Sequence, residues 1–196
     1  MPSGAEIQKN LTGAWGMMMG KADGLRLLDL SADGFWNSFF AIVVALPALA
    51  LSWISVADDL TLNLVGVTKF SVIARLAVVD VGTWVLPLVG LALAARPAGI
   101  ADRFVHYVVA SNWGSAILLW LMLPAALVRL LAPSAHQLAA LVTLLSYGLT
   151  LVLAWRLTNV AIGRGAALAT SVFGGMFVAS LLVLYLLQHL VGLSPS

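Results

Sequence analysis

Five long apolar runs, separated by short polar segments, constrain this chain more than any other feature. They extend over about residues 37–56, 76–95, 104–128, 138–155 and 167–191. The hydrocarbon core of a bilayer is about 30 Å thick and is crossed by roughly 20 helical residues, so each run has the length of a transmembrane helix. Backbone amides in lipid must be satisfied internally, and strand alternation is absent. The sequence predicts an all-α, polytopic bundle of five transmembrane helices.

The composition supports lipid as the solvent. Hydrophobic residues make up 62% of the chain and charged residues 9%, against roughly 45–50% and about 25% in soluble domains. The net charge is only +2 and the ten Lys and Arg residues are scattered singly, so we expect no nucleic-acid partner. The absence of cysteine excludes disulfides, thiolate zinc sites and cysteine nucleophiles. We expect an integral protein of a bacterial plasma (inner) membrane, with the lipid bilayer as its main partner.

The chain divides into a cytoplasmic or interfacial segment, residues 1–35, and a transmembrane domain, residues 36–192. Apolar residues in the first segment recur every three or four positions, which predicts an amphipathic helix over residues 6–20; they are Ile7, Leu11, Trp15 and Met18. This helix is expected to lie along the membrane interface or to pack under the bundle, and docking on a partner is an alternative. Ser31 is a suitable N-cap, which places the start of the first membrane helix near Ala32.

The number of spans and their direction depend on the polar connections. The third and fourth runs are separated only by residues 129–137, so a re-entrant pair is an alternative that would leave three spans. With a cytoplasmic N-terminus, seven Lys and Arg residues fall inside and three outside, which favours an N-in, C-out orientation. Pro47, Pro87 and Pro124 lie within spans and predict helix kinks.

Asp80 is the only acidic residue well inside a predicted span. A charge at mid-helix costs about 2.5–3.5 kcal/mol on insertion scales, so this carboxyl group needs a partner or a proton. Asp80 and Arg129 are predicted in the same outer half of the membrane, which favours an ion pair between them. The alternative is a protonatable carboxyl group in an ion or proton path.

Three polar residues cluster near the start of the third span, namely His106, Tyr107 and Asn112. They are predicted at a depth similar to that of Arg103 and Arg156, so together they would line a polar pocket. In the alternative interpretation, His106 and Tyr107 are interfacial and Asn112 forms a hydrogen bond between helices, worth about 0.6–2 kcal/mol.

Aromatic and small residues predict where the helices meet lipid and each other. Tryptophans near span ends are typical of interfacial belts, and here they are Trp36, Trp53, Trp113 and Trp155. Trp84 and Trp120 lie deeper and are expected to be packed. In the fifth span, small residues recur every four positions and predict a helix-packing face; they are Ala167, Ser171, Gly175 and Ala179. Its partner is either the same chain or a second copy.

The motifs of known enzyme classes are absent from the sequence. There is no H-E-x-x-H, no G-x-S-x-G, no P-loop and no pair of intramembrane aspartates. The three histidines lack ligand spacing; they are His106, His136 and His189. We therefore expect a non-enzymatic protein without catalytic residues, cofactor or metal.

The stretch LRLLDLSADGFWNSFFAI, residues 25–42, followed by five closely spaced spans, resembles the YIP family. Eukaryotic members of that family act in membrane traffic and bind Rab-type GTPases. The D-L-Y-G-P type segment of the eukaryotic branch is absent, so no GTPase-binding residues are assigned. The resemblance implies a helical bundle that organises or assembles with other membrane components, or with copies of itself. The alternative is a small transporter or channel with Asp80 in the path.

Overall fold

The computed structural model describes residues 1–61, 68–132 and 134–193, which contain helices and turns and no strand. Five helices in these ranges are long and apolar enough to cross a membrane, so the predicted all-α fold with five helices of spanning length is confirmed. The elements, in chain order, are α1 (Gly4–Met18), η1 (Ala22–Leu27), α2 (Ala32–Ser38), α3 (Ala41–Thr61), α4 (Lys69–Ala94), η2 (Ala101–Arg103), α5 (Phe104–Leu131), α6 (His136–Ile162) and α7 (Ala166–Leu190).

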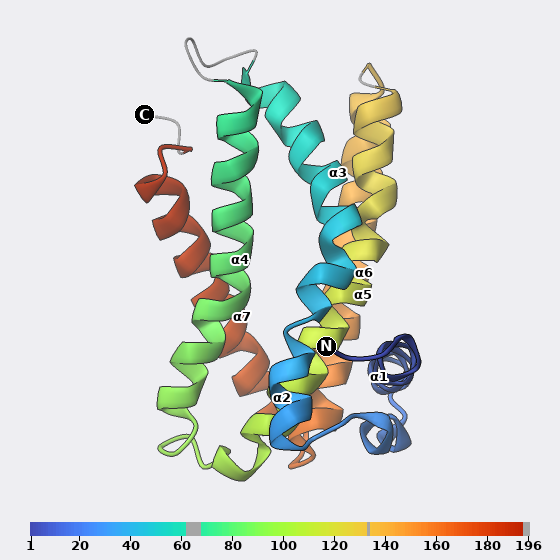
Figure 1. Cartoon of the computed structure of the whole chain (residues 1–196), viewed down its shortest axis with the longest axis vertical. Coiled ribbons are helices and arrows are strands. Elements are labelled where there is room, and N and C mark those ends of the chain that lie inside the picture. The colour runs from blue at the N-terminus through green and yellow to red at the C-terminus, as the bar shows by residue number, and fades with distance from the viewer. Residues whose placement is uncertain (62–67, 133, 194–196) are drawn as a thin grey trace.

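The long helices run up and down along one axis (Figure 1). The turns between α4 and α5 and between α6 and α7 lie at the same end of the bundle as the N-terminal segment, and α7 finishes at the opposite end. Arg164 joins the two turns at the N-terminal end of the bundle, because it donates hydrogen bonds to the Gly99 carbonyl and to the Asp102 carboxylate, the latter at 2.8 Å. At the opposite end, Lys69 at the start of α4 pairs with Asp58 of α3.

The helices α5 and α6 are continuous over 28 and 27 residues. Each is therefore long enough for a full span, which contradicts the re-entrant alternative for the third and fourth runs. Pro47, Pro87 and Pro124 lie inside α3, α4 and α5, and the helices continue through them.

The five long helices form a ring in which α3 packs on α4, α4 on α7, α7 on α6, α6 on α5 and α5 on α3. The helix α5 packs extensively on both α3 and α6, whereas α4 packs mainly on α7 and barely touches α5. Glycines allow the close contacts: a Cβ atom on Gly114 would lie 2.5 Å from Leu157 of α6, and one on Gly82 would lie 2.5 Å from Leu187 of α7. The separation between α4 and α5 leaves room for the cavity described below.

Large apolar side chains cover the outer surface of the long helices. Leu93, Leu144 and Leu186 are 80%, 69% and 56% exposed, and many other leucines and valines behave in the same way. Exposed apolar surface of this extent is unfavourable in water, and it matches the demands of a lipid environment. Each long helix therefore has one face buried in the bundle and another, also apolar, face on the outside.

The N-terminal helix α1 lies across the long axis of the bundle and packs on α5, α6 and η1 (Figure 1). Its buried face agrees with the predicted one in part: Met18 is buried, and Ile7 and Leu11 pack against the core. Trp15, in contrast, is 44% exposed, and Gly13 is buried. Gly13 allows η1 to approach closely, since a Cβ at that position would lie 2.7 Å from the backbone oxygen of Gly24.

Polar contacts hold this segment in place. Asn10 is buried: its side chain donates to the Glu6 carbonyl at 2.8 Å and accepts from the Asp29 N–H at 3.2 Å. Ser3 and Glu6 form a capping box at the start of α1. The Ser3 N–H and hydroxyl hold the pKa of Glu6 below its ordinary value, and hydrogen bonds from Ser31 lower the pKa of Asp29.

The first membrane helix begins as predicted. Ser31 is the N-cap of α2, and its hydroxyl accepts a hydrogen bond from the Gly34 N–H at 3.0 Å. A short break at residues 39–40 then separates α2 from α3. Gly34 lies close to Asp29, because a Cβ atom on Gly34 would lie 2.2 Å from the Asp29 backbone oxygen. This close approach places the linker against the start of the helix.

Candidate functional site

A cavity of about 500 Å³, partly open to the surface, lies in the bundle where α4 and α7 are separated from α5. Its walls come from all five long helices, with α3 contributing Leu49. Ligand sites in proteins typically enclose about 300–1,000 Å³ and combine apolar walls with a few polar groups. This cavity has that size and that composition, so we take it as the candidate functional site.

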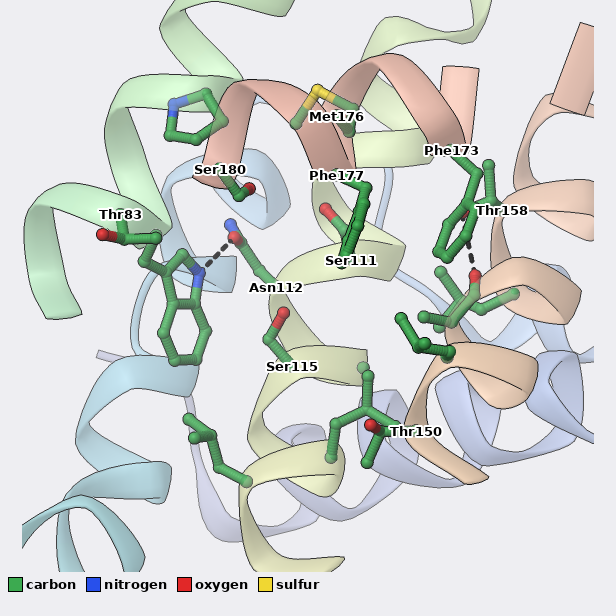
Figure 2. A pocket seen from close by; sticks show the side chains of 18 of the residues that line it. Thr83, Ser111, Asn112, Ser115, Thr150, Thr158, Phe173, Met176, Phe177 and Ser180 are labelled. Carbon is green, nitrogen blue, oxygen red and sulfur yellow. Dashed lines mark hydrogen bonds between the residues drawn. The ribbon is translucent and has the colours of Figure 1, made fainter. Parts of the chain in front are cut away.

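The polar groups of the cavity are mostly hydroxyls. Figure 2 shows Ser111, Asn112 and Ser115 of α5 on one side and Ser180 of α7 facing them across the space. The hydroxyls of Ser115 and Ser180 have no hydrogen-bond partner among the described residues, so they are available to a ligand or to water. Other polar side chains in the wall are Asp80, Thr83, Tyr107, Tyr147, Thr150 and Thr158.

Asp80 lines the cavity and is the sole acidic residue among the described residues that do so. Its Oδ2 atom accepts a hydrogen bond of 2.6 Å from the indole N–H of Trp53 on α3. The expected ion pair with Arg129 is absent from the described residues, because Arg129 lies beside a separate, smaller cavity between α3, α5 and α6. The sequence prediction was wrong because equal depth does not place two side chains on facing surfaces.

Asn112 is fully buried and links three parts of the fold. Its Oδ1 atom accepts from Trp84 Nε1 of α4 at 2.9 Å, a contact drawn in Figure 2. Its Nδ2 atom donates to the Ser38 hydroxyl at 2.8 Å, which in turn donates to the Phe35 carbonyl at 2.7 Å. This chain of bonds agrees with the predicted contact between helices, and it fixes the floor of the cavity.

The polar pocket expected around His106 is only partly present. Tyr107 and Asn112 line the cavity, whereas His106, Arg103 and Arg156 do not. His106 and Tyr107 are neighbours on a helix, so their side chains diverge by about 100° and only one of them can point inward. Nδ1 of His106 is buried without a hydrogen-bond partner among the described residues.

The tryptophans follow the predicted belt only in part. Trp36 is 70% exposed, as an interfacial residue would be, whereas Trp113 is 1% exposed and belongs to the core. Trp84 is packed at the cavity, as expected. Trp120, predicted to be packed, is 43% exposed and donates to the Val44 carbonyl at 3.1 Å. Trp155, on a half-buried part of α6, donates to Thr170 of α7 at 3.0 Å.

The small-residue stripe of α7 faces outward. Ala167, Ser171 and Gly175 are exposed and Ala179 is half-buried, and a Cβ on Gly175 would meet nothing within 4 Å. The stripe is therefore not a packing face within this chain. The glycines that do permit close helix contacts, Gly82 and Gly114, do not belong to a small-residue repeat of this kind.

Sequence reasoning missed the serines and threonines of the cavity. The overlooked residues are Thr83, Ser111, Ser115, Thr150, Thr158 and Ser180. Hydroxyl residues are tolerated in membrane helices because they bond to the carbonyl one turn earlier, as Thr158 does with Ala154 at 2.9 Å. Several such residues spread over four predicted spans were a usable signal, but their convergence depends on how the helices rotate against each other.

Comparisons with protein-family models, with curated proteins and with solved structures found no match to this chain. The resemblance to the YIP family stays a prediction from the sequence.

Proposed function

We propose that this protein binds a small solute inside the membrane, in the cavity between the α4–α7 and α5–α6 pairs, and carries it between the two sides. The supporting observation is the position of Asp80, a carboxyl group in the wall of a cavity of about 500 Å³ with no cationic partner among the described residues. Ionisable residues within membrane helices are costly, and they commonly mark substrate or ion pathways. One hydrogen bond from Trp53 does not neutralise the carboxylate, so Asp80 requires either a proton or a positively charged ligand.

The separation of α4 and α7 from α5 supports the carrier function. These two helices pack closely on each other, with Leu187 against Gly82, and make few contacts with α5. They are joined to the remaining helices through the contacts of α4 with α3 and of α7 with α6. We infer that the pair tilts on these two contacts, since rocking of one group of helices against another is a common mechanism of alternating access. The cavity lies between this pair and α5.

A second candidate function is assembly with other membrane components, as the YIP resemblance implies. The observation that favours it is the outward position of Ala167, Ser171 and Gly175, which leaves a smooth strip on α7 where another helix can approach. This function predicts a protein partner or a second copy, whereas the carrier function predicts a bound small molecule.

Native mass spectrometry after purification in a mild detergent distinguishes the two functions. If the cavity holds a solute, the protein carries an additional small mass that is lost when the cavity is filled by Ser115→Trp and retained in the control Leu182→Trp, whose parent side chain is 58% exposed. A protein partner or dimer that survives Ser115→Trp, without any small mass in the wild type, would overturn the carrier proposal.

We also propose an N-in, C-out orientation in a bacterial inner membrane. The N-terminal segment shares one end of the bundle with the turns that carry Arg96, Arg103 and Arg164. Cytoplasmic connections are enriched in Lys and Arg. The basic end is therefore assigned to the cytoplasm.

A further inference from the structure

The charge of the cavity indicates the class of ligand. Asp80 is in the wall, and among the described residues no Lys, Arg or His lines the cavity. In the low dielectric of a membrane interior, a negative ligand would be repelled by the carboxylate and would find no cation to pair with. A positive ligand would pair with the carboxylate and neutralise it. The cavity therefore selects for a cation against an anion.

Asp80 has an oxygen atom available for this pairing. The Trp53 indole occupies Oδ2 at 2.6 Å, and Oδ1 receives no hydrogen bond from the described residues. The Trp53 contact orients the carboxyl group and leaves one face open. The hydroxyls of Ser115 and Ser180, also without partners among the described residues, add further oxygen atoms in the same cavity.

The walls favour an organic cation over a metal ion. Hard metal ions require about six or more oxygen ligands, usually with several carboxylates, and the described residues contain no cluster of three or more His, Cys, Asp or Glu side chains. The cavity instead presents aromatic rings, which attract organic cations through their faces; they belong to Trp84, Tyr107, Tyr147, Phe173 and Phe177. Phe173 and Phe177 are nearly parallel, with ring centroids 6.4 Å apart, and both contribute apolar surface to the cavity.

We propose that the cavity binds an amphipathic organic cation, with its positive charge at Asp80 and its apolar body against the aromatic walls of α5, α6 and α7. This inference rests on the proposed function and specifies its ligand. An organic cation of this class is itself soluble in the bilayer, so it can reach the cavity from the lipid as well as from water.

Two ions of the same shape and opposite charge provide the test. Tetraphenylphosphonium and tetraphenylborate are titrated by equilibrium dialysis against the full chain in nanodiscs, with empty nanodiscs of the same lipid subtracted. We expect saturable binding of tetraphenylphosphonium and none of tetraphenylborate. Asp80→Asn, which keeps the size of the side chain and an acceptor for Trp53, should weaken tetraphenylphosphonium binding at least tenfold, whereas Asp80→Glu should stay within about threefold of the wild type.

The outcomes separate the cation proposal from the proposed function. Equal binding of tetraphenylphosphonium to the wild type and to Asp80→Asn, or no saturable binding to the wild type, overturns the cation proposal. If Ser115→Trp still removes a small mass from the purified protein in that case, the cavity is a solute site for a neutral ligand, and only the ligand class is wrong. Saturable binding of tetraphenylborate that Asp80→Asn does not change also overturns the cation proposal. Circular dichroism of each variant verifies that the helices are intact.

Discussion

The contact between α1 and η1 provides a sharp test of the packing argument, because two glycines of the same helix should respond to the same substitution with opposite signs. A Cβ on Gly13 would lie 2.7 Å from the backbone oxygen of Gly24 and 3.0 Å from Leu27 Cβ. Ordinary contact begins at 3.4 Å, so α1 would have to move away by about 0.7 Å (3.4 − 2.7). At Gly16 the nearest atom would be at 3.5 Å, which is ordinary contact.

The expected magnitudes follow from two effects. Overpacking of this kind costs about 1–3 kcal/mol, and replacing a mid-helix glycine by alanine gains about 0.5–1 kcal/mol. Gly13→Ala should therefore destabilise the docked segment by about 1–2 kcal/mol and increase its opening about 5–30-fold. Gly16→Ala should instead stabilise it by about 0.5–1 kcal/mol, because only the gain in helix propensity applies.

Hydrogen–deuterium exchange of peptides covering residues 4–28, measured in nanodiscs at constant pH and temperature, reports the opening. An undocked helix of 15 residues is marginal in water, so loss of docking exposes its amides to exchange. We expect faster exchange in Gly13→Ala and slower exchange in Gly16→Ala. Slower exchange in both variants would show that α1 does not pack through Gly13, and the reasoning from the close backbone contact would be refuted.

Three further predictions follow from the described contacts. Asn112→Ala leaves the Trp84 N–H without its acceptor, which costs about 1–3 kcal/mol; thermal unfolding in detergent should begin several degrees lower, and an unchanged midpoint would argue against the network. Asp29 has a folded-state pKa below its ordinary value of 3.8, so its contribution to stability is present above about pH 4 and lost as the pH falls. Tryptophan fluorescence should therefore change on acidification less in Asp29→Asn than in the wild type, and identical titrations would contradict this. Because the chain lacks cysteine, single cysteines report orientation cleanly: an impermeant maleimide should label Ser134→Cys and not Ala98→Cys in intact cells, and the reverse pattern would invert the proposed topology.

The sequence predicted the membrane helices well because their signal is local. Each apolar run is long enough to identify a span without knowledge of its neighbours, and the N-cap at Ser31 depends only on residues within one turn. The buried face of α1 was predicted less well. Hydrophobicity placed Trp15 on the buried face, whereas the docked helix leaves it exposed and buries Asn10 between the Glu6 carbonyl and the Asp29 amide. The choice depends on a partner surface that a single segment does not reveal.

The candidate site, like the fold, was predicted from the sequence only in part. Asp80 was recognised from the sequence because a carboxyl group in an apolar run is unusual by itself. Its partner was not, since Arg129 was predicted as the partner and Trp53 as an interfacial residue, and only the packing of α3 against α4 brings the Trp53 indole to the carboxyl group. Ser115 and Ser180, which are isolated serines in separate spans, become neighbours of one cavity only after α5 and α7 have packed.

By itself, the sequence determined that the apolar helices require lipid around them, how many long helices there are, and where the one carboxyl group within a predicted span lies. These properties follow from the cost of exposing apolar surface to water and backbone amides to lipid, and that cost is fixed segment by segment. The tertiary structure alone decided which side chains face the interior, and therefore that a cavity exists and that Asp80 lines it. Helices of nearly uniform hydrophobicity give no preferred face, so their rotation is set by the fit of small residues such as Gly82 and Gly114 against neighbouring leucines.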